Sequence, residues 1–115
     1  MYALLALALI AQVAAPAAPP PRVMPYVEVL RCAGLTQAAS ELEGGESKEG
    51  QILFDAALYW SLAASQIALA GGQSPEKADA DQNSARILAV RQLQLGNAQA
   101  RTELDTCRRR TPDLG

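Results

Sequence analysis

Two cysteines, Cys32 and Cys107, restrict the fold of this chain more than any other feature of its sequence. They are its only cysteines, and nearly every segment with a foldable pattern lies between them. An even number of cysteines behind an export leader favours pairing, so we predict one Cys32–Cys107 disulfide. The two residues do not form a CxxC motif, which favours a structural cross-link over a redox-active pair.

The N-terminal segment has the pattern of an export leader. Residues 1–21 contain no charged side chain, and an apolar run over residues 4–11 is followed by small residues. This pattern is typical of a secretory signal peptide, and the run is shorter than the about 20 apolar residues that span a bilayer. We predict a signal peptide over residues 1–18, with an uncleaved N-terminal anchor as the alternative. Cleavage is expected after Ala15, Ala17 or Ala18.

Behind the leader, the proline-rich residues 19–25 predict an extended, disordered linker. The leader and the paired cysteines together predict a periplasmic or secreted protein, most simply of a bacterial envelope. Removal of the leader leaves roughly 95 residues, enough for one small domain. The chain has 10 basic and 12 acidic residues, a formal net charge of −2. This balance gives no electrostatic reason to expect a nucleic-acid partner.

The domain carries helical patterns and lacks the sustained alternation that is typical of strands. Helix-capping residues and glycine pairs divide it into four predicted helices, over residues 26–42, 47–70, 75–95 and 98–110, with a disordered tail over 111–115. In the first helix, four residues recur at 3-4-3 spacing and predict its buried face: Cys32, Leu35, Ala39 and Leu42.

The predicted disulfide requires a break after the third helix. An unbroken helix from Pro75 would carry Cys107 roughly 20 Å past Cys32, at about 1.5 Å per residue. A disulfide needs its two Cα atoms within about 7 Å. Gly96–Asn97 is the expected break, since glycine suits a helix end and asparagine a helix start. If Gly96 lies within a helix instead, the disulfide is intermolecular or the first helix lies across the bundle. We therefore predict an all-α fold, a small up-down four-helix bundle whose last helix descends beside the first.

The second predicted helix is apolar nearly all round. Between residues 52 and 70 only Asp55 is charged. The pattern predicts a central helix that is packed by neighbours on several sides. A membrane span is the rival interpretation, but Ser61, Ser65 and Gln66 interrupt the apolar run.

Residues for catalysis or metal binding are scarce. The chain has no histidine, the commonest general base and zinc ligand. Residues 79–83 match the opening of a calcium loop, but Ser84 and Val90 stand where a glycine and a bidentate glutamate are required. We predict no catalytic residue, no metal site and no cofactor.

Two surface features could bind a partner. Ile87, Leu88 and Leu95, around Arg91, form a second apolar side of the third helix, which neighbouring helices cover or which a protein partner or a second copy contacts. Arg108, Arg109 and Arg110 lie at a helix end, where they offset the helix dipole or contact an anionic partner. A membrane is expected as a partner only through an uncleaved leader.

The sequence therefore predicts a non-enzymatic binding or interaction module of the cell envelope. The general build, a small exported helical domain with one disulfide, is similar to small periplasmic acid-stress chaperones, although no motif carries that resemblance. A holdase-type stress chaperone is the alternative function that the resemblance implies. An enzyme of unknown type is the third.

Overall fold

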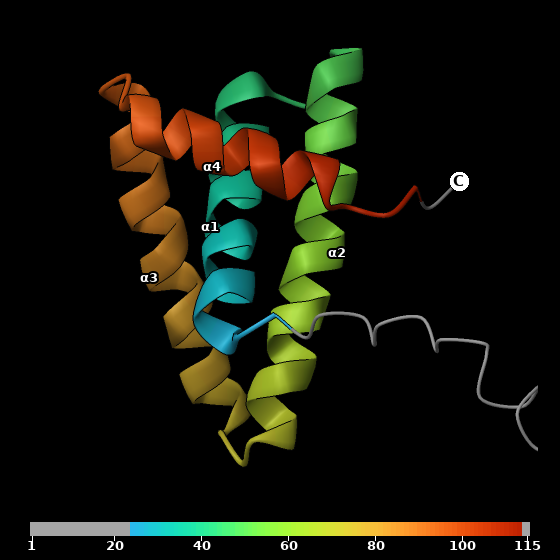
Figure 1. Cartoon of the computed structure of the whole chain (residues 1–115), viewed down its shortest axis with the longest axis vertical. Helices are drawn as coiled ribbons and strands as arrows, with labels where there is room; N and C mark the ends of the chain where they lie inside the picture. Colours follow the sequence, from blue (N-terminus) through green and yellow to red (C-terminus); the bar gives the residue numbers. More distant parts are fainter. Residues whose placement is uncertain (1–23, 114–115) are drawn as a thin grey trace, which may run out of the picture.

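The domain consists of four α-helices. The computed structural model describes residues 24–113, which form α1 (Tyr26–Glu43), α2 (Lys48–Ala70), α3 (Pro75–Gln94) and α4 (Ala98–Arg109), without strands (Figure 1). The all-α fold class with four helices is confirmed, and each helix boundary lies within one residue of the predicted one. The predicted signal peptide and most of the predicted linker lie outside the described residues.

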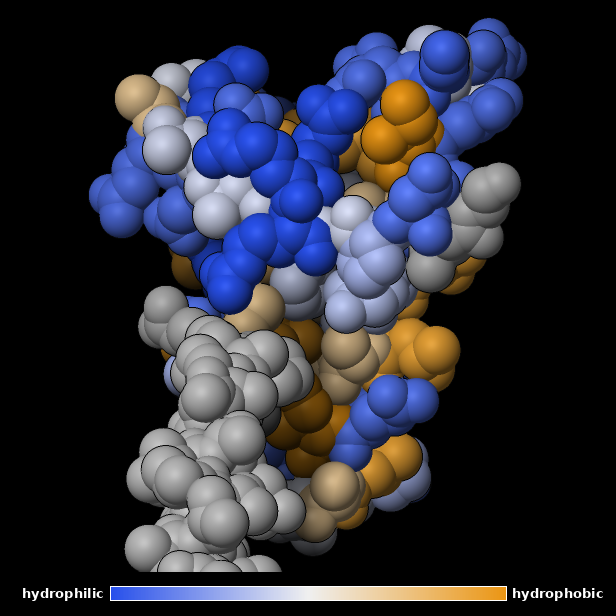
Figure 2. All heavy atoms as spheres, turned by 45° about the vertical axis from the view of Figure 1, so that its right-hand side comes forward, coloured by the Kyte–Doolittle hydropathy of each residue, from blue (hydrophilic) through white to orange (hydrophobic). Residues whose placement is uncertain are grey.

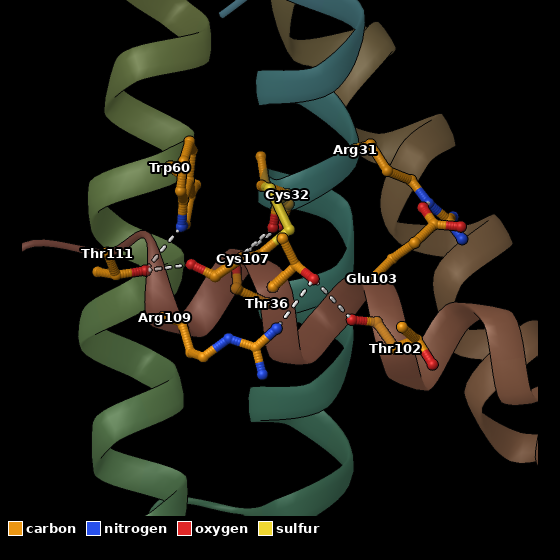
Figure 3. The surroundings of a disulfide bond; sticks show 11 residues. Arg31, Cys32, Thr36, Trp60, Thr102, Glu103, Cys107, Arg109 and Thr111 are labelled. Atoms are coloured by element: carbon orange, nitrogen blue, oxygen red, sulfur yellow. Dashed lines mark hydrogen bonds and ion pairs between the residues drawn. A yellow bond between two sulfur atoms is a disulfide. The ribbon is translucent and has the colours of Figure 1, made fainter. Parts of the chain in front are cut away.

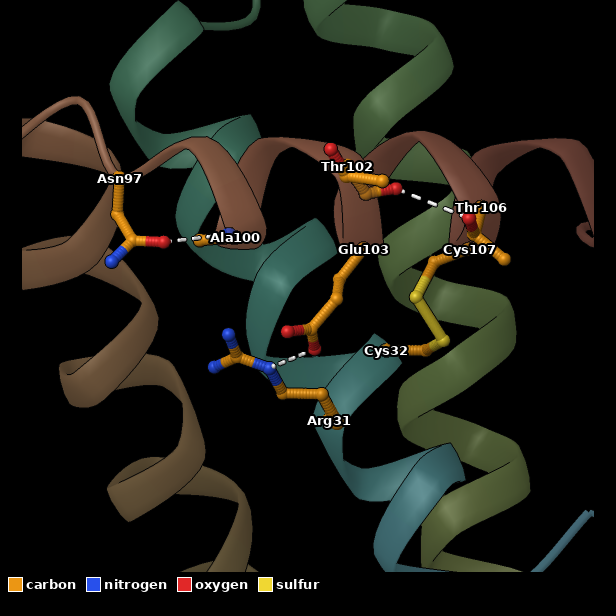
Figure 4. A network of polar contacts seen from close by, with 8 residues as sticks. All are labelled: Arg31, Cys32, Asn97, Ala100, Thr102, Glu103, Thr106 and Cys107. Atoms are coloured by element: carbon orange, nitrogen blue, oxygen red, sulfur yellow. Dashed lines mark hydrogen bonds and ion pairs between the residues drawn. A yellow bond between two sulfur atoms is a disulfide. The ribbon is translucent and has the colours of Figure 1, made fainter.

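Side-chain caps define three of the helix starts. Ser47, Ser74 and Asn97 each accept a hydrogen bond from a backbone N–H three residues further on, at 2.9, 3.2 and 2.8 Å. Between α3 and α4, Gly96 adopts a φ of 71°. This left-handed conformation costs glycine little, and it ends α3 where the disulfide argument requires a break. Figure 4 shows Asn97 capping α4.

The disulfide joins the first helix to the last. Cys32 in α1 and Cys107 in α4 are bonded, with their Cα atoms 5.4 Å apart and a sequence separation of 75 residues. Both cysteines are buried in the core, together with Leu35 and Ala100. The predicted pairing is confirmed.

The central helix is α1, and the prediction that residues 52–70 form it was wrong. α1 packs against all three other helices, whereas α2 packs mainly on α1 along one side. Small residues of α1 let its neighbours approach closely. An added Cβ atom at Gly34 would lie 2.6 Å from the backbone carbonyl of Ala85 in α3. An apolar surface on all sides therefore does not make α2 central; the small residues of α1 do.

The predicted buried face of α1 is confirmed except at its last residue, Leu42. Cys32, Leu35 and Ala39 are buried, but Leu42 is 46% exposed. Leu42 lies in the last turn of α1 and lines an open groove that Leu93 of α3 and Leu104 of α4 also border. The groove leaves the Leu42 side chain only partly covered.

α4 lies across α1 instead of descending beside it (Figure 1). Its start follows α3 directly, while its other end is held on α2. There the Trp60 indole N–H donates to Thr111 Oγ1 at 2.8 Å, and Arg108 pairs with Glu49 at 3.0 Å. A helix tied to α3 at one end and to α2 at the other has to cross the helix between them.

Thr111 belongs to the fold, although the sequence placed it in a disordered tail. Its hydroxyl accepts from Trp60 and donates to the Cys107 carbonyl at 2.8 Å. The indole is buried, and a buried donor without an acceptor is costly. Figure 3 shows this contact beside the disulfide.

We predict that Gly34→Ala destabilises the protein by about 1–3 kcal/mol, because the clash with Ala85 outweighs the better helix propensity of alanine. Chemical unfolding followed by circular dichroism measures the effect. Gly45→Ala is the control, since an added Cβ there has no neighbour within 4 Å. Equal stability of the two variants would contradict the close approach of α1 and α3.

We predict that the double variant Cys32→Ala/Cys107→Ala loses on the order of 4 kcal/mol of stability, the entropy of the released loop. α4 should loosen first, because its packing is mainly on α1. Amide hydrogen exchange checks this: protection should fall more over residues 98–109 than in α1. Undiminished protection of α4 would show that the disulfide is dispensable for its position.

Candidate interaction surface

The side of α2 that faces away from α1 carries several exposed apolar side chains. We call it the outer face of α2 and define it by its exposed large side chains: Ile52, Phe54, Leu58, Leu62 and Leu69. Leu58 and Leu62 are 54% and 62% exposed. Hydrophobic residues occur along the height of this flank in Figure 2, which turns the α2 side forward. Single exposed apolar residues are ordinary, whereas a row of them along one helix marks a contact surface.

The composition of α2 explains why this face exists. The opposite side of the helix already supplies the contact with α1, through Leu53, Trp60 and Ala64 among its buried residues. Trp60 also stacks edge-on against Tyr59, with ring centroids 5.1 Å apart. The outer leucines, about half of whose surface remains exposed, bury less apolar surface than the residues on this packed side.

α2 is also the one helix among residues 24–113 that is long and apolar enough to cross a bilayer by length and composition. In this fold, however, α2 packs against α1 and also contacts α3. α3 exposes charged residues such as Glu76, Asp79 and Arg91. A crossing α2 would bring such charges to the depth of the hydrocarbon, which is expensive. We therefore interpret α2 as part of the helical domain.

Ser61 and Ser65, which interrupt the apolar run of α2, join a polar cluster between three helices. Gln37 of α1 donates to Ser61 Oγ and, at 3.5 Å, to Gln82 Oε1 of α3. The Gln82 amide in turn donates to the Ser61 carbonyl at 3.2 Å and to Ser65 Oγ at 2.9 Å. Sequence analysis missed this cluster. The two serines are four residues apart, which places them on one side of the helix and could have indicated a shared polar neighbour.

A second polar contact joins the first residue of α1 to α3. The Tyr26 hydroxyl donates to Asp81 Oδ2 at 3.0 Å, and Lys77 pairs with Asp81 Oδ1 at 2.7 Å. The hydrogen bonds from Lys77 and Tyr26 hold the pKa of Asp81 below its usual value. Burial, together with the Asp81 carboxylate, raises the pKa of the Tyr26 hydroxyl.

Ion pairs connect the helices at three further places. Arg31 of α1 pairs with Glu103 of α4 at 2.8 Å, as Figure 4 shows. Arg86 of α3 pairs with Glu41 of α1 at 3.0 Å. Together with the Arg108–Glu49 pair, these contacts leave every helix tied to another by a carboxylate.

The second apolar side of α3 is exposed as well. Ile87, Leu88 and Arg91 are exposed, and Leu95 is 86% exposed at the end of the helix. The alternative that neighbouring helices cover this side was wrong, because its side chains still face water in the assembled fold. Arg91 interrupts its apolar surface, which lies on a different helix from the outer face of α2.

The three arginines do not act as one site. Arg108 is paired with Glu49, and Arg109 donates to Thr106 Oγ1 at 3.4 Å. Arg110 lines a groove beside the disulfide with Met24 and Val27. Of the predicted anionic contact, only Arg109 and Arg110 remain exposed. Their position at the end of α4 suits the helix dipole.

Within the described part of the chain, no group of three or more histidine, cysteine, aspartate or glutamate residues could hold a metal ion. Asp79 and Asn83, from the calcium-loop match, are instead exposed residues of the straight helix α3. Comparisons with protein-family models, with curated proteins and with solved structures gave no match.

We predict that the Tyr26–Asp81 contact stabilises the protein only while Asp81 is ionised. Because the pKa of Asp81 is lowered by folding, its contribution is complete above the usual aspartate value of about 3.9 and is lost as the pH falls through the lower folded value. Asp81→Asn should therefore lose less stability on acidification than the wild type.

Urea unfolding at neutral and at strongly acid pH measures this difference. Asp79→Asn, which removes an exposed acid from the same helix, is the control and should follow the wild type. Parallel acid curves for wild type and Asp81→Asn would refute the linkage.

Proposed function

We propose that this protein is a non-enzymatic interaction module of the cell envelope and that the outer face of α2 is its contact surface. The observation that carries the proposal is the row of exposed apolar side chains on a helix whose other side packs against α1. In water, such a row is stabilised by a partner that covers it.

The disulfide supports the envelope location. It is a buried structural cross-link between the first and last helices, and such bonds persist in oxidising compartments. The proposed export leader agrees with this placement.

The use of the polar side chains supports a binding role over catalysis. Gln37, Gln82, Tyr26 and Asp81 all bond across helix interfaces and so hold the domain together. Nucleophilic catalysis would instead need polar groups that converge on a cavity, with a base beside a nucleophile.

A holdase-type chaperone is the second candidate, favoured by the carboxylates that tie the helices together. Glu41, Glu49 and Glu103 each pair with an arginine of another helix, so ion pairs contribute to the contacts between the helices. The disulfide would keep α4 on α1 while α2 and α3 loosen. A holdase should then bind an apolar dye and suppress aggregation of a client protein at acid pH. An unchanged dye signal would exclude it.

A photo-reactive amino acid at residue 62, introduced in the native host, tests the proposed surface. Ultraviolet light should yield a covalent adduct at this position, because a bound partner would lie against Leu62. The matched control is residue 99, an exposed position on α4. Residue 88 probes the rival surface on α3.

The position and mass of the adducts decide the outcome. An adduct at residue 62 and none at residue 99 supports the outer face of α2 as the contact surface. An adduct at residue 88 alone would move the surface to α3. Equal yields at residues 62 and 99 would overturn the proposal, because contact would then be unselective.

A further inference from the structure

We propose that the Cys32–Cys107 disulfide is a redox latch: a dithiol that enters the groove beside the bond reduces it, and α4 then moves away from α1. This inference is independent of the contact surface on α2. Three observations support it: α4 has few buried residues, both cysteines border an open groove, and a glycine joins α4 to α3.

α4 is short and polar, so the covalent bond is its main attachment to α1. Of its 12 residues, only Ala100 and Cys107 are buried. Helices of this length are marginal by themselves in water, because most helical stability in proteins comes from packing. Two ion pairs also hold α4, but the side chains that form them are between 24% and 45% exposed, and pairs that water reaches contribute little.

The disulfide lies beside an open groove. Cys32 and Cys107 both border a groove of about 430 Å³ between the start of α1 and α4. Only 5% and 3% of the two residues is exposed, whereas Val27, which also borders the groove, is 75% exposed. The groove therefore leads from the surface to the bond, and its volume is large enough for a small dithiol.

The charges around the groove favour attack at Cys107. Arg110 follows Cys107 by three residues and Glu28 precedes Cys32 by four, so each charge neighbours a cysteine on one side of its helix. The two other charges of the groove form the ion pair between α1 and α4 and offset each other. An attacking thiolate is negative, so it approaches the sulfur beside Arg110 more easily than the sulfur beside Glu28.

The reduction proceeds by two thiol–disulfide exchanges. A thiolate of the dithiol attacks Cys107 Sγ, forms a mixed disulfide and releases Cys32 as a thiolate. The second thiolate of the dithiol then attacks its own sulfur in the mixed disulfide, closes a cyclic disulfide and releases Cys107. Two electrons pass from the dithiol to the cysteines, and the two protons that the dithiol loses end on the two cysteine thiols.

Reduction frees α4 at a hinge and opens an apolar site. Gly96, with its φ of 71°, connects α4 to α3 and tolerates a change of backbone conformation better than other residues. Leu104 of α4 borders the same groove as Leu53 of α2 and Leu93 of α3, which are 4% and 8% exposed. Displacement of α4 removes this wall, so the reduced protein presents an apolar site that the oxidised protein covers.

The rate of reduction without denaturant tests whether the groove admits a dithiol. Dithiothreitol is added to the oxidised protein, and the thiols that appear are alkylated and measured by mass. The rate should rise in proportion to the dithiothreitol concentration and exceed the rate of global unfolding. A rate that levels off at the rate of global unfolding would overturn the proposal, because the bond would then be reached only in the unfolded chain.

Two tryptophan variants test the route. Val27→Trp fills the groove and should slow the reduction several-fold. Gln99→Trp places the same side chain at an exposed position of α4 outside the groove and should react like the wild type. Circular dichroism shows that each variant keeps its helices. Equal rates for the two variants would exclude the groove as the route and refute the latch.

Amide hydrogen exchange of the reduced protein tests the movement of α4. Protection should fall over residues 98–109 and persist in α2 and α3, and reoxidation should restore it. Retained protection of α4 would overturn the latch, since α4 would then keep its place without the bond. Equal loss of protection in all four helices would overturn it as well, because reduction would then unfold the whole domain.

Discussion

The disulfide between Cys32 and Cys107 is the constraint on which the arrangement of the helices depends. It bonds the last helix covalently to the first, beside the Arg31–Glu103 ion pair that joins the same two helices. The Trp60–Thr111–Cys107 hydrogen bonds extend this attachment to α2, so that three helices meet beside one covalent bond. A small alanine-rich core buries little surface for its length, and such domains often rely on a cross-link.

Small residues on α1 allow the other helices to pack closely against it. Ala33, Gly34 and Ala38 are buried and give α1 a narrow surface on which other helices can pack closely. Such packing gains dispersion contacts but buries few large side chains. The large aliphatic residues of α2 are therefore distributed between a buried side and an outer face. The apolar content of α2 exceeds what the domain can cover, and this excess is the physical basis of the proposed contact surface.

The sequence predicted the parts of the fold that depend on local chemistry. Ser47, Ser74 and Asn97 mark helix starts because their side chains bond backbone N–H groups a few residues away. Gly96 marks the break between α3 and α4, because glycine readily adopts the left-handed conformation that ends a helix and because the short disulfide requires a break near this position. The prediction that α2 is the central helix was wrong, because hydropathy indicates which surface a helix can bury and not how many neighbouring helices it has. The predicted burial of Leu42 was wrong because its spacing fits the buried face, whereas in the fold it borders an open groove.

The candidate site was only partly predictable for the same reason. The apolar nature of residues 52–70, the extra leucines of α3 and the arginine run could all be read from the chain. Which of these surfaces is covered depends on neighbours that are distant in sequence. Arg108 forms an ion pair with Glu49, so it is not free to bind an anionic partner. Ser61 and Ser65 accept hydrogen bonds from Gln37 and Gln82. By itself, the sequence determined the helices, their ends and the covalent link, because capping, glycine conformation and cysteine pairing are short-range or covalent. Only the tertiary structure decided that α1 is central, that α4 crosses it and that one side of α2 faces water, because these depend on how closely helices far apart in the chain can approach.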